Sequence, residues 1–288
     1  NSSIAAMNEK VKKRLPKKYQ KKCKIVGDLM ADIDNEGKYS LKRDKERWIA
    51  ILPGSKKAKL SIGIPFFLEM ADHISSNKSD IKLMIPIAPT INIKDFIYYQ
   101  SDKNPLAKHY SSKIKHIKKS KESIFQYELE TKNNTKIYLI SNSPAYQVLK
   151  QCELAITTVG ANTAELAAIN LPMIVVLPTQ HLNQMTAWDG IFGLIGKIPI
   201  INKIISTCVK NWYLNNKKFF SWPNIKANRL IVPERIGKIK PKEIAEEAIY
   251  LLSNSKLLQD QRQNLIRERG SLGAVKKLTN LIIDSIID

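Results

Sequence analysis

Short apolar runs recur along most of the chain and are separated by longer, more polar stretches. Five of these runs begin near residues 48, 81, 137, 155 and 173, and each is apolar enough for a strand that is covered on both faces. Helices are predicted between them. Strands that alternate with helices predict an α/β fold, with a Rossmann-like parallel sheet and helices on both faces.

Residues 152–178 form the most informative unit of this pattern. The run Ala155–Thr158 predicts a short strand, and Gly160 follows at a turn where backbone can approach a ligand closely. A helix then leads to a second apolar run, Met173–Leu177. In a unit of strand, helix and strand, a ligand binds at the carboxyl ends of the strands beside the helix N-terminus.

The polar residues of this unit suggest how a nucleotide would bind. Asn162 or Thr163 can cap the helix, and Glu165 lies in its first turn. Backbone N–H groups at the turn would face a phosphate, and Glu165 would accept hydrogen bonds from a ribose hydroxyl. The same residues also fit an ordinary unit of this kind with no ligand.

A second glycine turn follows the run Trp48–Leu52. Pro53-Gly54-Ser55 forms the predicted turn, and a helix is expected from about Ser61 to Ser75. A glycine turn with cationic side chains at a helix N-terminus is a suitable diphosphate site, although such turns are common. The cations that follow this turn are Lys56, Lys57 and Lys59.

Ser221–Glu234 is a third stretch rich in turn and polar residues. Asn224 suits a tight turn and could cap a helix or contact a ligand, and Arg229 could bind a diphosphate through its planar, permanently charged guanidinium. Pro233-Glu234 could begin a helix or hold the end of a strand. An ordinary turn with a surface arginine is the alternative.

The remaining pattern predicts further elements. Residues 92–123 suggest a polar helical region, whose seven lysines between Lys103 and Lys121 form a solvated face. Residues 136–141 predict a strand, and residues 144–150 a short helix. Three helices are expected at Lys240–Asn254, Lys256–Arg269 and Ala274–Ile287.

We expect three parts in the chain. Residues 1–45 are a basic lead-in and hinge, residues 46–254 a Rossmann-like ligand-binding domain with an insertion at about 179–220, and residues 255–288 the C-terminal helices. The lead-in is a solvated helical segment or contacts anionic lipid. Within the insertion, Ile191–Ile205 suits an interfacial hairpin or a core-packing helical segment.

Composition narrows the class of protein. The 288 residues include 47 Lys and Arg against 26 Asp and Glu, a net charge of +21 that attracts anions. Much of this lysine could equally be generic solvated surface. No run of about eighteen apolar residues is present, so no transmembrane helix is predicted. The three cysteines fit a reducing compartment. Aromatic residues, 7% of the chain, do not interleave with the basic runs, which makes nucleic acid the weaker partner.

Other chemistries have little support. The four histidines form no metal-ligand spacing, so no metal or cofactor is predicted. The GxSxG, Walker and GxGxxG sequences are absent. His181, just after a predicted strand, is a possible site residue, and Asp189 is a possible acid or base. The residue that would act in catalysis remains unassigned.

Three separated pieces together resemble one family. In order and spacing, ILPGSKK, TTVGANTAELAAINLPMIVV and SWPNIKANRLIVPE are similar to the carboxyl-terminal half of lipid-A-disaccharide synthases, as is the preceding KIVGDLMADI. The resemblance implies one half of a GT-B glycosyltransferase fold. It also implies transfer of an N-acetylglucosamine derivative from UDP to a lipid, at the cytoplasmic membrane face and without a metal. The amino-terminal half, which carries acceptor contacts, is not supplied by this sequence.

The resemblance assigns site residues position by position. Lys56 stands where the family usually has Arg, Ala161 and Asn162 replace Thr and Ala, and Asp28 stands where His is common. Gly160 and Glu165 match the family pattern. The residues expected to bind the substrate are Gly54, Ser55, Lys56, Gly160, Asn162, Thr163, Glu165, Asn224 and Arg229.

The predicted function is therefore UDP-sugar binding in a lipid-A-disaccharide-synthase-like glycosyltransferase. Its expected partners are a UDP-sugar donor and an anionic membrane surface or lipid acceptor, its expected location is cytoplasmic or peripheral on the inner membrane face, and an oligomer is compatible with the sequence. Two alternatives are a UDP-N-acetylglucosamine 2-epimerase-like enzyme and a non-catalytic basic module that binds anionic membranes or nucleic acid.

Overall fold

The structure is a computed structural model that describes residues 3–33, 41, 46–141, 143–180 and 219–287. Most of the predicted insertion, together with His181, Asp189 and the segment Ile191–Ile205, lies outside these residues. So does most of the link between the hinge and the first strand of the domain.

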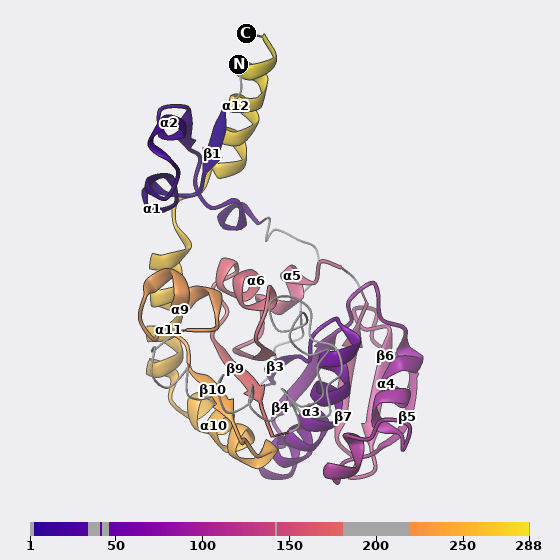
Figure 1. Ribbon diagram of the computed structural model, residues 1–288. Coiled ribbons are helices and arrows are strands. Elements are labelled where there is room, and N and C mark those ends of the chain that lie inside the picture. Colours follow the sequence, from indigo (N-terminus) through magenta and orange to yellow (C-terminus); the bar gives the residue numbers. More distant parts are fainter. Residues whose placement is uncertain (1–2, 34–40, 42–45, 142, 181–218, 288) are drawn as a thin grey trace, which may run out of the picture.

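An eight-stranded sheet forms the centre of the molecule (Figure 1). Its first six strands are parallel, and the last two run antiparallel to their neighbours. In spatial order the strands are β10 (Glu234–Gly237), β9 (Met173–Pro178), β8 (Leu154–Thr158), β3 (Arg47–Leu52), β4 (Ile81–Pro86), β7 (Lys136–Ile140), β6 (Tyr127–Thr131) and β5 (Ile114–Lys119). The predicted α/β fold with a parallel sheet is confirmed, and the five predicted strands are among these eight.

Helices cover both faces of the sheet because successive strand residues point to opposite sides. On β3, Ile49 and Ile51 pack into one core, and Trp48 and Ala50 into the other. The first core includes residues of α3 (Lys57–Asn77), α4 (Ile93–Gln100), α10 (Pro241–Ser253) and the start of α11 (Ser255–Arg269). The second includes residues of α5 (Tyr146–Leu149), α6 (Asn162–Ala168) and the middle of α11.

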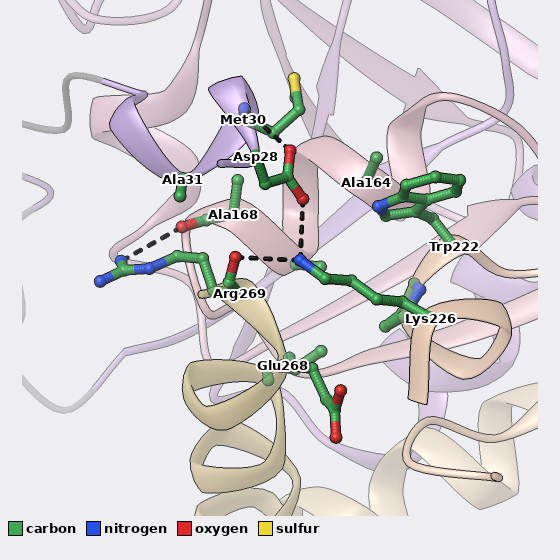
Figure 2. Close-up of a pocket in the computed structure, with 12 residues that line it drawn as sticks. Asp28, Met30, Ala31, Ala164, Ala168, Trp222, Lys226, Glu268 and Arg269 are labelled. Atoms are coloured by element: carbon green, nitrogen blue, oxygen red, sulfur yellow. Dashed lines mark hydrogen bonds and ion pairs between the residues drawn. The ribbon is translucent and has the colours of Figure 1, made fainter. Parts of the chain in front are cut away.

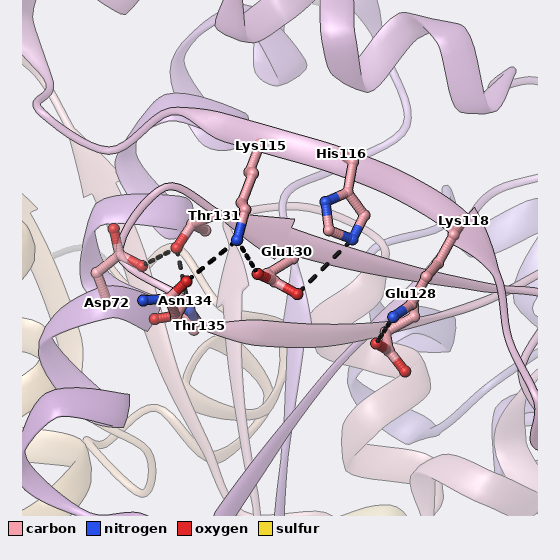
Figure 3. A network of polar contacts seen from close by, with 9 residues as sticks. All are labelled: Asp72, Lys115, His116, Lys118, Glu128, Glu130, Thr131, Asn134 and Thr135. Carbon is pink, nitrogen blue, oxygen red and sulfur yellow. Dashed lines mark hydrogen bonds and ion pairs between the residues drawn. The ribbon is translucent and has the colours of Figure 1, made fainter.

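The lysine-rich stretch was predicted to be helical. The structure instead places an edge strand in it. After α4 and a 3-10 turn, η2 (Ala107–His109), the chain enters β5 and returns through β6. Figure 3 shows the reason. Lys115 and Lys118 of β5 pair with Glu130 and Glu128 of β6, at 2.7 and 3.0 Å, so the lysines gain cross-strand partners.

The first part of the chain folds into a small unit of its own rather than a helical lead-in. Strands β1 (Ile4–Ala6) and β2 (Cys23–Ile25) pair in parallel, and between them lie α1 (Glu9–Lys13) and α2 (Lys17–Gln20). Figure 1 shows this unit and α12 (Ala274–Ile287) apart from the large sheet.

A short hinge helix connects this unit to α12. The hinge, η1 (Leu29–Asp32), follows β2 directly. The Asp32 carboxylate accepts the N–H groups of Gly273 and Val275, each at 2.6 Å, and so caps α12.

Candidate functional site

The two predicted glycine turns lie next to each other at the carboxyl end of the sheet. Strands β3 and β8 are adjacent and parallel, with Leu52 opposite Thr157, so the turns that follow them meet at one edge. Gly54 has φ +102° and Gly160 has φ +149°, a region of backbone conformation that other residues rarely adopt. This edge is where open parallel sheets bind ligands.

Helix α3 packs closely on the first turn. A Cβ atom added to Gly63 would lie 2.7 Å from the carbonyl oxygen of Pro53, so glycine is needed for this approach. Lys56 at the N-cap makes no side-chain capping bond. Within the described part of the chain, no side chain caps the first-turn N–H groups of this 21-residue helix, which lie beside the turn. Ser55 and Lys56 are exposed there.

Lys59 lies between the two turns, although the sequence analysis did not count it among the substrate-binding residues. Its Nζ donates to the Val159 carbonyl at 2.7 Å. A Cβ atom on Gly160 would lie 2.7 Å from this Nζ, and one on Gly54 would lie 2.9 Å from the Lys59 Cβ. The sequence did indicate this lysine. Lys59 is three residues after the N-cap Lys56, so it lies on the same side of α3 as the start of the helix.

The start of α6 differs from the prediction that Asn162 or Thr163 caps this helix. Ala161 is the N-cap and makes no side-chain capping bond. The buried Thr163 hydroxyl instead donates to the Gly160 carbonyl at 2.8 Å and accepts the Trp222 N–H at 3.0 Å. Thr163 thus ties the second glycine turn to the stretch Ser221–Glu234, because a hydroxyl can donate and accept at once.

Glu165 lies in the first turn of α6, as predicted, and is half-buried. Its carboxylate shares a hydrogen bond with the Tyr146 side chain from α5. Burial raises the pKa of Glu165 above its usual range, and the Tyr146 hydrogen bond opposes that rise. Tyr146 is a second residue that sequence reasoning missed as part of the site, because nothing in its spacing relates it to Glu165.

Asn224 holds its own segment together. In α9 (Trp222–Ala227) its fully buried amide accepts the N–H groups of Ile231 and Val232 and donates to the Val232 carbonyl. It also donates to Glu234, which accepts the Ser221 N–H at 2.8 Å. Asn224 thus lies within a helix and not in the predicted tight turn, and the hydrogen-bonding atoms of its amide are engaged within this segment.

The polar residues after Asn224 face α11 and the hinge. Arg229 donates to Asn264 at 3.1 Å and lies 3.6 Å from Glu268. Lys226 pairs with Asp28 at 2.8 Å and also donates to the Arg269 carbonyl. The Lys226–Asp28 pair lines a small pocket between the hinge, α6, α9 and α11 (Figure 2).

Two further findings limit the chemistry of the described residues. Within these residues, no group of three His, Cys, Asp or Glu side chains is placed to hold a metal ion. None of their helices is both long and apolar enough to cross a bilayer.

Comparison with known proteins identifies relatives over most of the chain. No family model matches it. The lipid-A-disaccharide synthase of Sulfurihydrogenibium sp. strain YO3AOP1 is 26% identical over 262 residues, which cover 88% of this chain and 56% of that protein. The synthase of Nitrosococcus oceani is 23% identical over 78% of this chain and 44% of its own length. The chain thus spans about half the length of these curated relatives.

Solved structures support the fold. The co-structure of Staphylococcus aureus MnaA with UDP matches 92% of this chain and 55% of its own, with a TM-score of 0.51 and 12% sequence identity. At this identity the likeness concerns the fold alone. The chain is a homologue of the lipid-A-disaccharide synthases, with an α/β fold that resembles one half of a GT-B glycosyltransferase.

Proposed function

We propose that this chain binds the UDP-sugar donor, of the UDP-N-acetylglucosamine type, in a glycosyltransferase that transfers the sugar to a lipid acceptor. The main observation behind the proposal is the pair of neighbouring glycine turns at the carboxyl ends of β3 and β8. Gly54 and Gly160 have backbone conformations that favour glycine, and each turn leads into a helix N-terminus. Such a place favours a diphosphate.

Each candidate residue has a proposed role. The backbone at Gly54 and Ser55, with the Lys56 ammonium, binds the diphosphate, while Gly160 allows it to approach closely. Glu165 accepts the ribose hydroxyls. Asn162 lies beside this position at the start of α6.

The other candidates act mainly by shaping the pocket. Thr163 and Asn224 hold the Gly160 turn and α9 in place through the hydrogen bonds described above. Arg229 would exchange its partners on α11, Asn264 and Glu268, for diphosphate oxygens.

The proposed chemistry is displacement at the anomeric carbon of the donor sugar. The negative charge that develops on the leaving diphosphate would be stabilised by the helix N-termini and by lysine side chains beside the glycine turns. The acceptor contacts and the general base are not assigned to residues of this chain.

Calorimetry with UDP, UDP-N-acetylglucosamine and ADP tests this proposal. We expect saturable binding of the uridine nucleotides in preference to ADP. Glu165→Ala should weaken UDP binding by about 10- to 100-fold, because hydrogen bonds to a charged group typically contribute about 1.5–3 kcal/mol. Glu243→Ala, on α10, is the matched control and should bind as the wild type does. Absence of UDP binding by the wild type, or an unchanged affinity in Glu165→Ala, would contradict the proposal.

A 2-epimerase-like enzyme is the second candidate, and it would also bind a UDP-sugar. The structural likeness to the UDP-bound MnaA is consistent with either enzyme. Product analysis separates the two, since an epimerase changes the sugar without a lipid acceptor. A non-catalytic basic module would bind anionic surfaces without preferring UDP over ADP.

A further inference from the structure

The strongest unexplained feature of the molecule is a buried hydroxyl beside the glycine turns. Thr158, the last residue of β8, is 8% exposed, and its Oγ1 has no hydrogen-bond partner among the residues that the structure describes. A buried polar atom without a partner is unfavourable, so it calls for an explanation. Thr158 lines an apolar hollow between α3 and β9, together with Lys59.

The Lys59 side chain and this hydroxyl approach the same point beside Gly54. The position that a Cβ atom on Gly54 would take is 3.0 Å from the Lys59 Cδ and 3.4 Å from the Thr158 Oγ1. The stem of Lys59 and the hydroxyl thus face the same turn. The ammonium continues to the Val159 carbonyl at 2.7 Å, where it occupies the space in front of Gly160.

We propose that Lys59 is an exchangeable cation that binds the diphosphate of the donor and uncovers the Thr158 hydroxyl as a second ligand. In the unliganded protein the Val159 carbonyl accepts a hydrogen bond from the ammonium. The diphosphate, being doubly or more negatively charged, is the stronger partner, because charge-assisted hydrogen bonds exceed neutral ones. When the ammonium moves onto it, the Thr158 hydroxyl gains an oxygen acceptor.

This inference rests on the proposed function and adds to it the residues that select a diphosphate over a monophosphate. The N-terminus of α3 supplies fixed N–H groups, whereas Lys59 supplies a cation that moves to its ligand. Lys78, at the C-cap of the same helix, is exposed and lies at the opposite end of α3 from the glycine turns. It is therefore a control with equal charge.

Calorimetry with UDP and UMP on the full chain tests the role of Lys59. We expect Lys59→Met to weaken UDP binding by about 10- to 100-fold, the range for losing a charged hydrogen bond. UMP binding should change by less than about 3-fold, because the terminal phosphate is missing. Lys78→Met should match the wild type for both ligands, and Lys59→Arg should restore most of the UDP affinity.

Thr158→Val provides an independent test that does not depend on charge. Valine has the shape of threonine and removes only the hydroxyl, which has no partner in the unliganded protein. We expect unchanged or higher stability, with UDP binding about 3- to 10-fold weaker.

The outcomes separate this inference from the proposed function. If the wild type binds UDP and Lys59→Met binds it equally well, the role of Lys59 is wrong while the proposed function stands. If the wild type does not bind UDP at all, both are wrong. A Thr158→Val variant with full UDP affinity would overturn the role of the hydroxyl.

Discussion

At the scale of single residues, the polar groups near the site are of two kinds. Some stabilise the fold through buried hydrogen bonds, and others are exposed at the sheet edge that carries the two glycine turns. Asn224, Glu234 and Thr163 make buried hydrogen bonds with one another's segments. Ser55 and Lys56, by contrast, are exposed beside the first-turn N–H groups of α3. Residue type alone does not separate these two groups, because asparagine and threonine serve equally well in turns and in ligand contacts.

Asn224→Ala tests the structural role of the buried amide. The substitution leaves the N–H groups of Ile231 and Val232 without their acceptor, so we expect the free energy of unfolding to fall by about 2–3 kcal/mol. Urea denaturation measures this. Asn264→Ala removes a less buried amide on α11 and should cost less than about 0.5 kcal/mol. Equal losses in the two variants would contradict the assignment.

At the scale of elements, the central strands were predictable and the edge strands were not. Strands β3, β4, β8 and β9 are continuous apolar runs because helices cover both of their faces. β5 is instead rich in lysine. Its lysines pair with glutamates of β6, and these partners are not apparent when the β5 segment is considered alone. The β5 sequence IKHIKK does not alternate between apolar and polar residues, and its pairing with β6 is interrupted by a register shift between Ile114 and His116.

The same division applies to the site. Both glycine turns could be located from local sequence, since each follows an apolar strand and precedes a helix. The contacts of Lys59 with Val159 and of Tyr146 with Glu165 join separate elements. These contacts depend on which strands are neighbours, and that order is not contained in any single stretch of the sequence.

The cap on α12 has a pH dependence with a definite sign. Hydrogen bonds from the N–H groups of Val275 and Gly273 hold the pKa of Asp32 below its ordinary value of 3.8. A carboxyl with a lowered pKa in the folded state stabilises that state above its ordinary pKa, and this contribution is lost as the pH falls through the lowered value.

Asp32→Asn should therefore lower the stability of α12 docking at neutral pH, with a smaller difference from the wild type below pH 3.8. Amide hydrogen exchange of α12, measured at several pH values, checks this expectation. Asp260→Asn, an exposed residue on α11, is the control and should show no such dependence. A wild-type protein whose α12 protection is flat across this range would contradict it.

At the scale of the whole molecule, the excess of positive charge is spread over more than the site. Part of it lies on α1 and α2, which are set apart from the sheet in Figure 1. Another part lies on the edge strand β5, where some of the lysines are paired with glutamate. The net charge of +21 is therefore only partly a property of the sheet edge that carries the two glycine turns.

Vesicle binding at increasing salt tests whether this charge binds an anionic surface. We expect binding to vesicles that contain anionic lipid and its loss between about 0.05 M and 0.5 M salt, because the screening length falls below about 10 Å over that range. Vesicles of neutral lipid should not bind. Persistence at the highest salt would show that apolar contacts dominate, and equal binding to DNA would show that the charge does not select lipid.

The Asp32 cap on α12 joins positions 241 residues apart in the chain. Closing a loop of that length costs conformational entropy that is recovered only after the intervening sheet has formed. The cap should therefore belong to the last events of folding and the first of unfolding. Variants of Asp32 would accelerate unfolding without slowing folding, and the sheet edge with the two glycine turns would assemble before these two parts of the chain meet.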